Sequence, residues 1–144
     1  MLFGEYHHTM DPQRRLSMPA KMREDLGNEV IIARSVRGNC LRFFSISAWK
    51  EYIEPIKKLP RSVSEQTYWY LYHDAIKDSF SSNGRVQLSE ELLAAIGVNA
   101  EKEDERNLVL VGCGDFGEIW SEKAYSAREI DVDAIRRALE ENGY

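Results

Sequence analysis

Two arginines that stand seventy residues apart, Arg15 and Arg85, carry the side chains best suited to binding chemistry in this sequence. Each guanidinium is a planar fork of N–H donors that can bind a phosphate or the O6 and N7 atoms of guanine in the major groove of DNA. Polar neighbours precede them, namely Gln13 and Arg14 before the first and Asn83 before the second. These residue types predict that both short segments contact nucleic acid.

The residues just upstream of each arginine are suited to shaping a turn. Asp11 is anionic and therefore a poor contact for DNA, so we expect it to accept backbone N–H bonds in the turn or to orient Arg15. Ser81 precedes Arg85 by the same number of residues and can make similar local bonds. Thr9 lies on the strand that leads into the first turn, where we expect it to bind phosphate or to structure the turn.

The sequence around the two arginines is written twice. Residues 15–27 align with residues 85–97 at an offset of 70, and each copy has an arginine, a short apolar and polar alternation, a helix start and a closing glycine. These glycines, Gly27 and Gly97, stand where a left-handed C-cap residue is favoured. The alternative interpretation is an ordinary polar hairpin turn. Recurrence of the arginine at the same place in two repeats favours a binding role.

Further along, the two copies align at an offset of 76, so that residues 38–45 face residues 114–121. The six extra residues fall around the polar stretch 101–106, a natural place for a loop insertion. In each copy an apolar strand, 30–33 or 108–111, precedes a turn-rich loop and a second strand. The expected order in each unit is strand, turn, strand, short helix, strand, turn, strand and helix.

Serines mark the expected starts of several helices. We expect the helix that closes each unit to begin at Ser47 in the first unit and at Ser121 in the second, because serine is a favoured N-cap residue. Between the units, Ser62 and Glu65 have the spacing of a capping box. That spacing predicts a helix that connects the two units.

The chain is therefore expected to have four parts. The last is an amphipathic terminal helix over residues 131–141, whose apolar side chains recur at helical spacing: Val132, Ile135 and Leu139. The predicted parts are a first repeat at 1–60, a connecting helix at 61–75, a second repeat at 76–126 and a helical tail at 127–144.

Composition predicts an ordered cytoplasmic protein. Apolar residues make up 43% and charged residues 30% of the 144 residues, close to the averages of globular proteins. No apolar run approaches the length of about 20 residues that crosses a bilayer, and the first ten residues lack the apolar core of a signal peptide. We expect no membrane association.

The net charge of −5 argues at first sight against nucleic acid, because affinity for DNA comes mainly from cations that neutralise phosphates. The charge is unevenly distributed, however. Residues 1–70 hold 11 basic and 8 acidic side chains, whereas residues 71–144 hold 8 basic and 16 acidic ones. A DNA-binding surface is therefore expected to favour the first half.

Catalytic chemistry has little support in the sequence. The candidates for a nucleophile, base or metal ligand are His7, His8, His73, Cys40 and Cys113, and none forms a known ligand spacing or nucleophile motif. The adjacent pair of histidines would project to opposite faces of a strand, which separates the two imidazoles. We expect no enzyme activity, no metal, no cofactor and no small-molecule substrate.

The segment Phe3–Asp11, followed by Arg15 and later by Gly84–Arg85, resembles the MraZ family, and the likeness covers nearly the whole chain. The resemblance implies a mixed α/β, β-rich fold of two tandem AbrB-like (SpoVT-AbrB) swapped-hairpin repeats, barrel-like and pseudo-twofold, with short helices. Each family repeat carries D-x-x-x-R, usually with glycine before the arginine. Here Arg14 replaces that glycine and Ser81 replaces the second aspartate. A positive φ at Arg14 would cost on the order of 1 kcal/mol.

The resemblance also implies a sequence-specific transcriptional regulator at the promoter of the bacterial division and cell-wall gene cluster, including its own gene. The expected partners are double-stranded DNA with repeated short motifs and further copies of the chain in a ring-shaped homo-oligomer. Gly84 then joins the arginines at the DNA, and the location is the cytoplasm and nucleoid. The alternative is an antitoxin-like protein-binding module of the same fold. The short helical tail and the well-formed second repeat favour the regulator.

Overall fold

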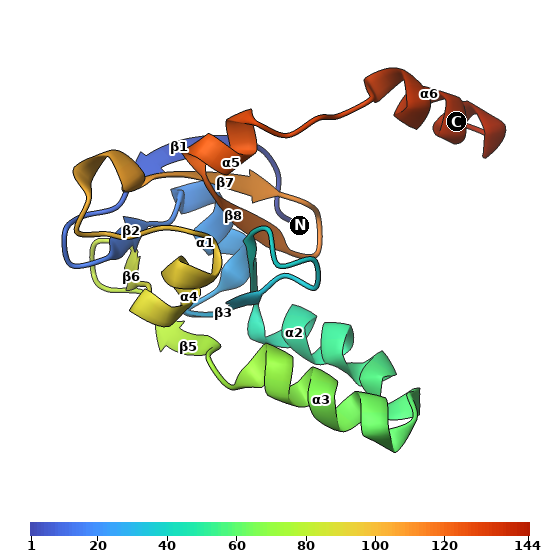
Figure 1. Ribbon diagram of the computed structural model, residues 1–144, viewed down its shortest axis with the longest axis horizontal. Helices are drawn as coiled ribbons and strands as arrows, with labels where there is room; N and C mark the ends of the chain where they lie inside the picture. The colour runs from blue at the N-terminus through green and yellow to red at the C-terminus, as the bar shows by residue number, and fades with distance from the viewer.

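The computed structural model describes residues 1–144 and repeats one order of elements in the two halves of the chain (Figure 1). The first half forms β1 (Glu5–Thr9), β2 (Arg15–Ser17), α1 (Ala20–Leu26), β3 (Glu29–Arg34), β4 (Leu41–Phe44) and α2 (Ile46–Ile53). The second half forms β5 (Ile76–Ser79), β6 (Arg85–Gln87), α4 (Glu90–Ala95), β7 (Asn107–Gly112), β8 (Gly117–Ser121) and α5 (Glu122–Ser126). The order predicted for each unit is confirmed. The remaining elements are η1 (Glu54–Lys58), α3 (Arg61–Tyr72), η2 (Glu103–Glu105) and α6 (Val132–Glu141).

The predicted mixed α/β, β-rich class is confirmed, but the large sheet does not close into a barrel. Six antiparallel strands follow the order β1-β7-β8-β4-β3-β5, while β2 and β6 form a separate two-stranded ribbon. The edge strands β1 and β5 each have one neighbour and do not pair with each other. After β1 and after β5 the chain turns out of the large sheet into the ribbon, so no strand remains to close the gap.

Strands of the two halves pair with one another in both sheets. First-half β1 pairs with second-half β7, β4 pairs with β8, β3 pairs with β5 and β2 pairs with β6. The counterparts in the two halves are β1 and β5, β3 and β7, and β4 and β8. Exchanging each strand for its counterpart gives the same strand order, read from the opposite edge of the sheet. A pseudo-twofold axis therefore runs between β4 and β8 and between β2 and β6. The predicted division of the chain at residues 60, 75 and 126 stays a prediction.

One large core lies between the six-stranded sheet, the ribbon and helices α1 and α4. Its fully buried side chains come from both halves of the chain: Leu16, Met22, Ile32, Leu41, Phe43, Leu88, Leu92, Leu108, Leu110 and Ile119. Burial of apolar surface contributes roughly 25 cal/mol per Å². Because both halves supply this core, the ribbon is held rigidly against the sheet.

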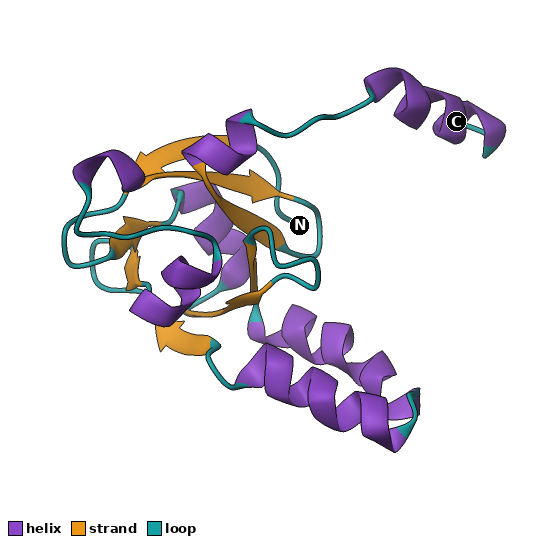
Figure 2. Cartoon of the chain, in the orientation of Figure 1, coloured by secondary structure: helices purple, strands orange, loops and turns teal.

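Helices α2 and α3 cover the outer face of β3 and β4 and extend from the body as a helical pair (Figure 2). Phe44, Trp49 and Leu71 are buried between the helices and the sheet. The Trp49 indole N–H also donates to the Tyr72 hydroxyl at 3.1 Å. None of the helices of the chain combines the length and apolar character that crossing a lipid bilayer requires.

One predicted helix start was wrong by two residues, and one predicted helix cap does not form. Helix α2 begins after Ser45, whose hydroxyl accepts from the Ala48 N–H, so Ser47 already lies inside the helix. Helix α3 begins after Pro60, and the capping box at Ser62 and Glu65 does not form. The preceding strand or proline turn determines where the helix begins, and the residue at that point becomes the cap. The serines further along then have no free N–H group to bind.

The start of α5 at Ser121 is confirmed, since its hydroxyl accepts from the Ala124 N–H at 3.1 Å. The predicted terminal helix is confirmed as α6, which Asp131 caps by accepting from the Ala134 N–H at 2.9 Å. Figure 1 shows α6 beyond the body at the end of an extended segment.

Candidate nucleic-acid interface

The β2–β6 ribbon brings the two arginines onto one exposed face. Successive side chains of a strand point to opposite faces, and here Leu16 and Val86 enter the core from the middle of the two strands. Arg15 pairs in register with Gln87, and Arg85 pairs with Ser17, so all four project from the other face. The Arg15 side chain is 49% exposed and the Arg85 side chain 34%. Residues far apart in sequence thus share a surface two strands wide.

The Asp11 carboxylate joins both arginines. Its Oδ1 atom accepts from the backbone N–H groups of Gln13 at 2.9 Å and Arg15 at 2.8 Å. Its Oδ2 atom accepts from Arg15 Nε at 2.7 Å and from Arg85 Nη1 at 3.4 Å. Desolvation acts to raise the pKa of Asp11, but the hydrogen bonds from Arg15 and Gln13 outweigh it and leave this pKa below its ordinary value. The carboxylate is therefore ionised at neutral pH and holds two cations in place.

The other polar residues of the first turn differ in what they contact. The Gln13 side-chain oxygen accepts from Arg15 Nη2, and the Gln13 carbonyl accepts from Gln87 Nε2 at 2.8 Å. Thr9 is directed elsewhere, since its hydroxyl donates to Asn107 Oδ1 at 2.7 Å and ties β1 to β7. The structure thus brings Gln13 to the arginine face and leaves Thr9 at the large sheet.

The second turn holds its arginine with neutral groups. The Ser81 hydroxyl accepts from the Arg85 N–H at 3.0 Å, as Asp11 does for Arg15. With its amide oxygen turned toward Arg85, Asn83 accepts from Nε at 3.1 Å and from Nη2 at 2.7 Å, while its amide nitrogen donates to Ser81. A serine and an amide here replace one carboxylate. The two turns are therefore equivalent in shape and different in charge.

Arg14 and Gly84 occupy equivalent positions in the two turns, and both have a positive φ. The φ angles are 66° and 75°, and Arg14 is the only non-glycine residue of the chain in this region. The backbone bonds are also equivalent, because Leu88 N–H donates to the Arg14 carbonyl and Met18 N–H donates to the Gly84 carbonyl. The strain expected for a side chain at position 14 is therefore present.

The Arg14 side chain binds the opposite half of the molecule. Its Nε donates to the Leu88 carbonyl at 2.9 Å, and its Nη1 lies 3.4 Å from Glu90 Oε1. The guanidinium of Arg14 is thus directed to the start of α4, away from the pair formed by Arg15 and Asp11. This bond offsets part of the backbone strain.

The equivalent carbonyl in the first half, that of Met18, is capped by a different arginine. Arg23, on α1, donates from Nε to the Met18 carbonyl at 3.1 Å. A Cβ atom at Gly84 would lie only 2.5 Å from the Arg23 guanidinium carbon. The counterpart of Arg23 in α4 is Leu93, which is buried in the core. The carbonyl of each half therefore accepts from one guanidinium. Beside Gly84 the donor is Arg23 of the helix, and beside Leu93 the donor is Arg14 of the turn.

Known proteins resemble the chain along its whole length. It is 31% identical over 149 residues to the transcriptional regulator MraZ of Caldicellulosiruptor bescii, with 99% of each chain covered. The transcriptional regulator MraZ of Clostridium acetobutylicum is 29% identical over 148 residues, again with 99% of each covered. A family model described as "MraZ protein, putative antitoxin-like" matches residues 1–69. The chain belongs to the MraZ family. The regulators' name supports the same broad class for this member.

The contacts of Arg14 and Arg23 with the two equivalent carbonyls were missed by sequence reasoning in this MraZ family member, although the sequence contains a signal for them. Aligned at the offset of 70, Arg14 faces Gly84 while Arg23 faces Leu93. Both arginines therefore lie in the first half, and the second half has neither of them. Only the fold shows that these positions surround one kind of carbonyl, because turn and helix come from different halves.

We expect Arg14→Ala and Arg14→Gly to differ in stability. Both variants lose the bond to Leu88, which contributes about 1 kcal/mol, but only glycine relieves a positive-φ strain on the order of 1 kcal/mol. The glycine variant should therefore unfold close to the wild-type urea concentration, and the alanine variant clearly below it. Equal losses in the two variants would contradict a strained turn. Measuring DNA affinity for the same pair tests the prediction that Arg14 contacts DNA.

The two thiols are poorly suited to nucleophilic chemistry. Burial, with a further contribution from nearby Glu118, raises the pKa of Cys40 to about 12. Burial also raises the pKa of Cys113. The nucleophile and metal ligand is the thiolate form, which a raised pKa disfavours. No group of three or more His, Cys, Asp or Glu side chains is arranged to hold a metal ion.

Proposed function

We propose that the protein is a sequence-specific DNA-binding transcriptional regulator that places its β2–β6 ribbon in the major groove. The observation that carries this proposal is the exposed face on which Arg15 and Arg85 stand together. A two-stranded ribbon fits the major groove, where a guanidinium can bind guanine O6 and N7. The site of action is the promoter of the division and cell-wall gene cluster, including the protein's own gene.

The proposed roles follow the two turns. Arg15 and Arg85 read bases, with Gln13 and Asn83 beside them and with Arg14 and Gly84 where the turn backbone approaches DNA. Asp11 and Ser81 hold the turns through their bonds to the following arginine N–H, and Thr9 supports the strand that leads into the first turn. The protein acts without catalysis or a cofactor.

The proposed assembly is a ring-shaped homo-oligomer on DNA with repeated short motifs, located at the nucleoid. A single chain presents one narrow ribbon and carries a net charge of −5. Such a chain has few cations with which to neutralise phosphates, so several linked copies are needed for tight binding.

The test is footprinting on DNA from upstream of the protein's own gene, together with competition by shuffled DNA of the same length. We expect a protected region that contains a short motif more than once, and affinity at least 10³-fold above that for shuffled DNA at physiological salt, the lower end for specific regulators. Equal affinity for both DNAs would overturn sequence-specific regulation.

Arg15→Ala is expected to weaken DNA binding more than Arg85→Ala. The first arginine is more exposed and lies in the more basic half of the chain. Each loss should amount to about 1 to 3 kcal/mol if the contact is bidentate. Fluorescence anisotropy with the footprinted motif measures both values. The reverse order would show that the charge difference between the halves does not describe the DNA-facing surface.

The alternative is an antitoxin-like module that acts mainly through another protein. One observation favours it, since α6 extends from the body with its apolar side chains half exposed. Purification from the native host separates the two proposals. A stoichiometric second protein supports the antitoxin-like module, whereas a homogeneous multimer of this chain supports the regulator.

A further inference from the structure

Gln87 projects from the same exposed face of the β2–β6 ribbon as Arg15 and Arg85. It lies in β6, pairs in register with Arg15 of β2 and is exposed. Leu16 and Val86 enter the core from the other face of the ribbon, so nothing in the chain covers the Gln87 side chain there. Its amide offers both a donor and an acceptor, the two groups with which a side chain reads the edge of a base.

The hydrogen bonds of the ribbon bring the Gln87 side chain close to that of Arg15. The Leu88 N–H donates to the Arg14 carbonyl at 2.8 Å, so Arg14 and Leu88 form a hydrogen-bonded pair. Because the two kinds of pair alternate along antiparallel strands, Arg15 and Gln87 form a non-hydrogen-bonded pair, in which the Cα atoms lie about 4.5 Å apart and the side chains are closer. Successive base pairs of DNA are about 3.4 Å apart. The guanidinium and the amide can therefore contact neighbouring base pairs.

The Gln87 amide is held in place and keeps the groups that a base needs. Its Nε2 atom donates to the Gln13 carbonyl at 2.8 Å, and the Gln13 side-chain oxygen accepts from Arg15 Nη2. An amide nitrogen carries two protons, so a second N–H of Gln87 stays free beside its Oε1 atom. Adenine presents an N7 acceptor and an N6 donor in the major groove, the pair that glutamine binds in a bidentate manner.

The counterpart of Gln87 in the first half lacks this chemistry. Ser17 aligns with Gln87 at the offset of 70 and pairs in register with Arg85. A serine hydroxyl is short and bonds to more than one kind of base, so it distinguishes bases poorly. The two ends of the ribbon face therefore differ. We expect base discrimination beyond that of the arginines at the end where Gln87 lies beside Arg15.

We infer that Gln87 determines part of the DNA sequence specificity by binding an adenine in the base pair next to the guanine that Arg15 binds. The inference rests on the proposed function for the placement of the ribbon in the major groove. Nε2 of Gln87 donates to adenine N7, and Oε1 accepts from the N6 amino group. The bond to the Gln13 carbonyl orients the amide before DNA is bound, which lowers the entropy lost on binding.

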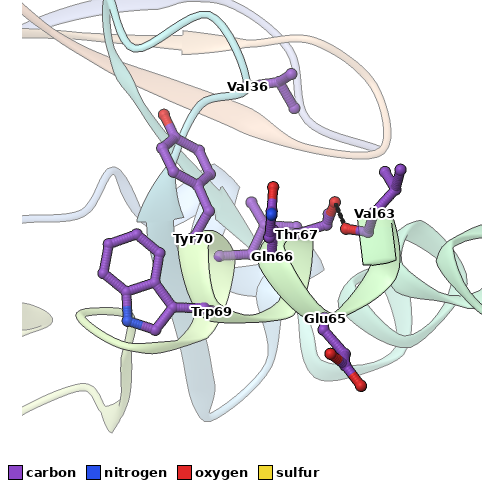
Figure 3. A pocket seen from close by; sticks show the side chains of 8 residues that line it. Val36, Val63, Glu65, Gln66, Thr67, Trp69 and Tyr70 are labelled. Atoms are coloured by element: carbon purple, nitrogen blue, oxygen red, sulfur yellow. Dashed lines mark hydrogen bonds between the residues drawn. The ribbon is translucent and has the colours of Figure 1, made fainter. Parts of the chain in front are cut away.

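A second exposed glutamine provides a matched control. Gln66 lies on α3, where it lines a cavity of about 710 Å³ together with Val63 and Trp69 (Figure 3). Figure 1 shows α3 well apart from β2 and β6. The only charged residue that lines this cavity is Glu65, an anion, so the surface is poorly suited to phosphate. Gln66→Met and Gln87→Met thus make the same chemical change at two separate surfaces.

The first test is selection of DNA by the full chain from duplexes that carry a randomised central segment. Wild type and Gln66→Met should select one motif in which an adenine adjoins a guanine. Arg15→Ala should lose the preference for the guanine, and Gln87→Met should lose the preference for the adjoining adenine alone. A preference that Gln87→Met leaves unchanged at every position overturns the assignment. So does a loss that includes the guanine, because a residue that only supports the turn through Gln13 would disturb Arg15 as well.

The second test measures the affinity of wild type and Gln87→Met for the selected motif. Gln87→Met should bind roughly 5-fold to 140-fold more weakly, the range of one bidentate base contact. Replacing the adenine by an analogue with carbon in place of N7 should weaken binding by wild type and leave binding by Gln87→Met unchanged. Equal losses in the two proteins on the altered DNA would show that Gln87 does not contact N7.

Failure of this inference differs from failure of the proposed function. A wild-type selection that enriches no sequence refutes the sequence-specific regulator. A selection in which Arg15→Ala loses a guanine and Gln87→Met loses nothing leaves the regulator standing and overturns the role of Gln87 alone.

Discussion

Replacing Arg15 and Arg85 together by alanine is expected to lower affinity for the footprinted motif roughly 30-fold to 10⁴-fold, since each lost bidentate base contact costs about 1 to 3 kcal/mol. The loss should come from the interface and not from the fold. The ribbon is held by Leu16 and Val86, which stay buried, while both arginine side chains lie on the open face. Removing them also leaves the Asp11 carboxylate unpaired there, which adds repulsion toward phosphate.

A matched control is the double variant Lys57→Ala and Lys58→Ala, which removes the same charge at η1. If the arginines read bases, the arginine variant should lose discrimination between the motif and shuffled DNA, and the lysine variant should keep it. Loss of phosphate contacts alone would weaken binding to all sequences alike and flatten the salt dependence. Unchanged affinity in a folded arginine variant would reject the β2–β6 ribbon as the DNA-binding surface.

The order of elements could be predicted because the two halves repeat a local pattern. Residues 15–27 and 85–97 carry the same alternation, helix start and closing glycine, and the structure forms β2, α1, β6 and α4 there. The capping residues of α2 and α3 were not predicted. Ser45 and Pro60 precede α2 and α3 as their N-cap residues because the path of the preceding chain places them there. This is a tertiary effect, which the capping preferences of single residues do not predict.

The pairing of strands could not be predicted from these patterns. Contacts such as Glu5 with Val111 join residues more than a hundred positions apart, and the alternation within each strand fits several partners equally well. The open sheet follows from that pairing, which sends β2 and β6 into their own ribbon.

For the candidate site, the sequence predicted the two arginines but not their arrangement. The repeat of the arginine at an offset of 70 predicted Arg15 and Arg85 as binding residues. The negative charge of Asp11 predicted that this residue shapes the turn. That one carboxylate contacts both guanidinium groups depends on the β2–β6 register, which places the second turn beside the first. The contact between Arg14 and Leu88 likewise joins two halves and has no local signal.

Affinity for DNA is expected to rise by about 10² to 10⁴ between DNA with one copy of the motif and DNA with several copies, because linked modules bind their later sites at high effective concentration. One chain supplies a single ribbon with two arginines at its face and a net charge of −5, so its own affinity should be weak. Several ribbons in one assembly add their contacts without adding new chemistry. The measurement is a titration of DNAs that carry one, two, three or four motifs.

The spacing of the motifs provides the decisive control. Inserting about 5 base pairs between motifs turns the next site to the opposite side of the helix, since one turn spans about 10 to 10.5 base pairs. A rigid assembly should then lose most of its gain in affinity, and insertion of a full turn should restore part of it. Tight binding of one motif by a monomer would refute the requirement for an assembly, because no avidity would remain to be explained.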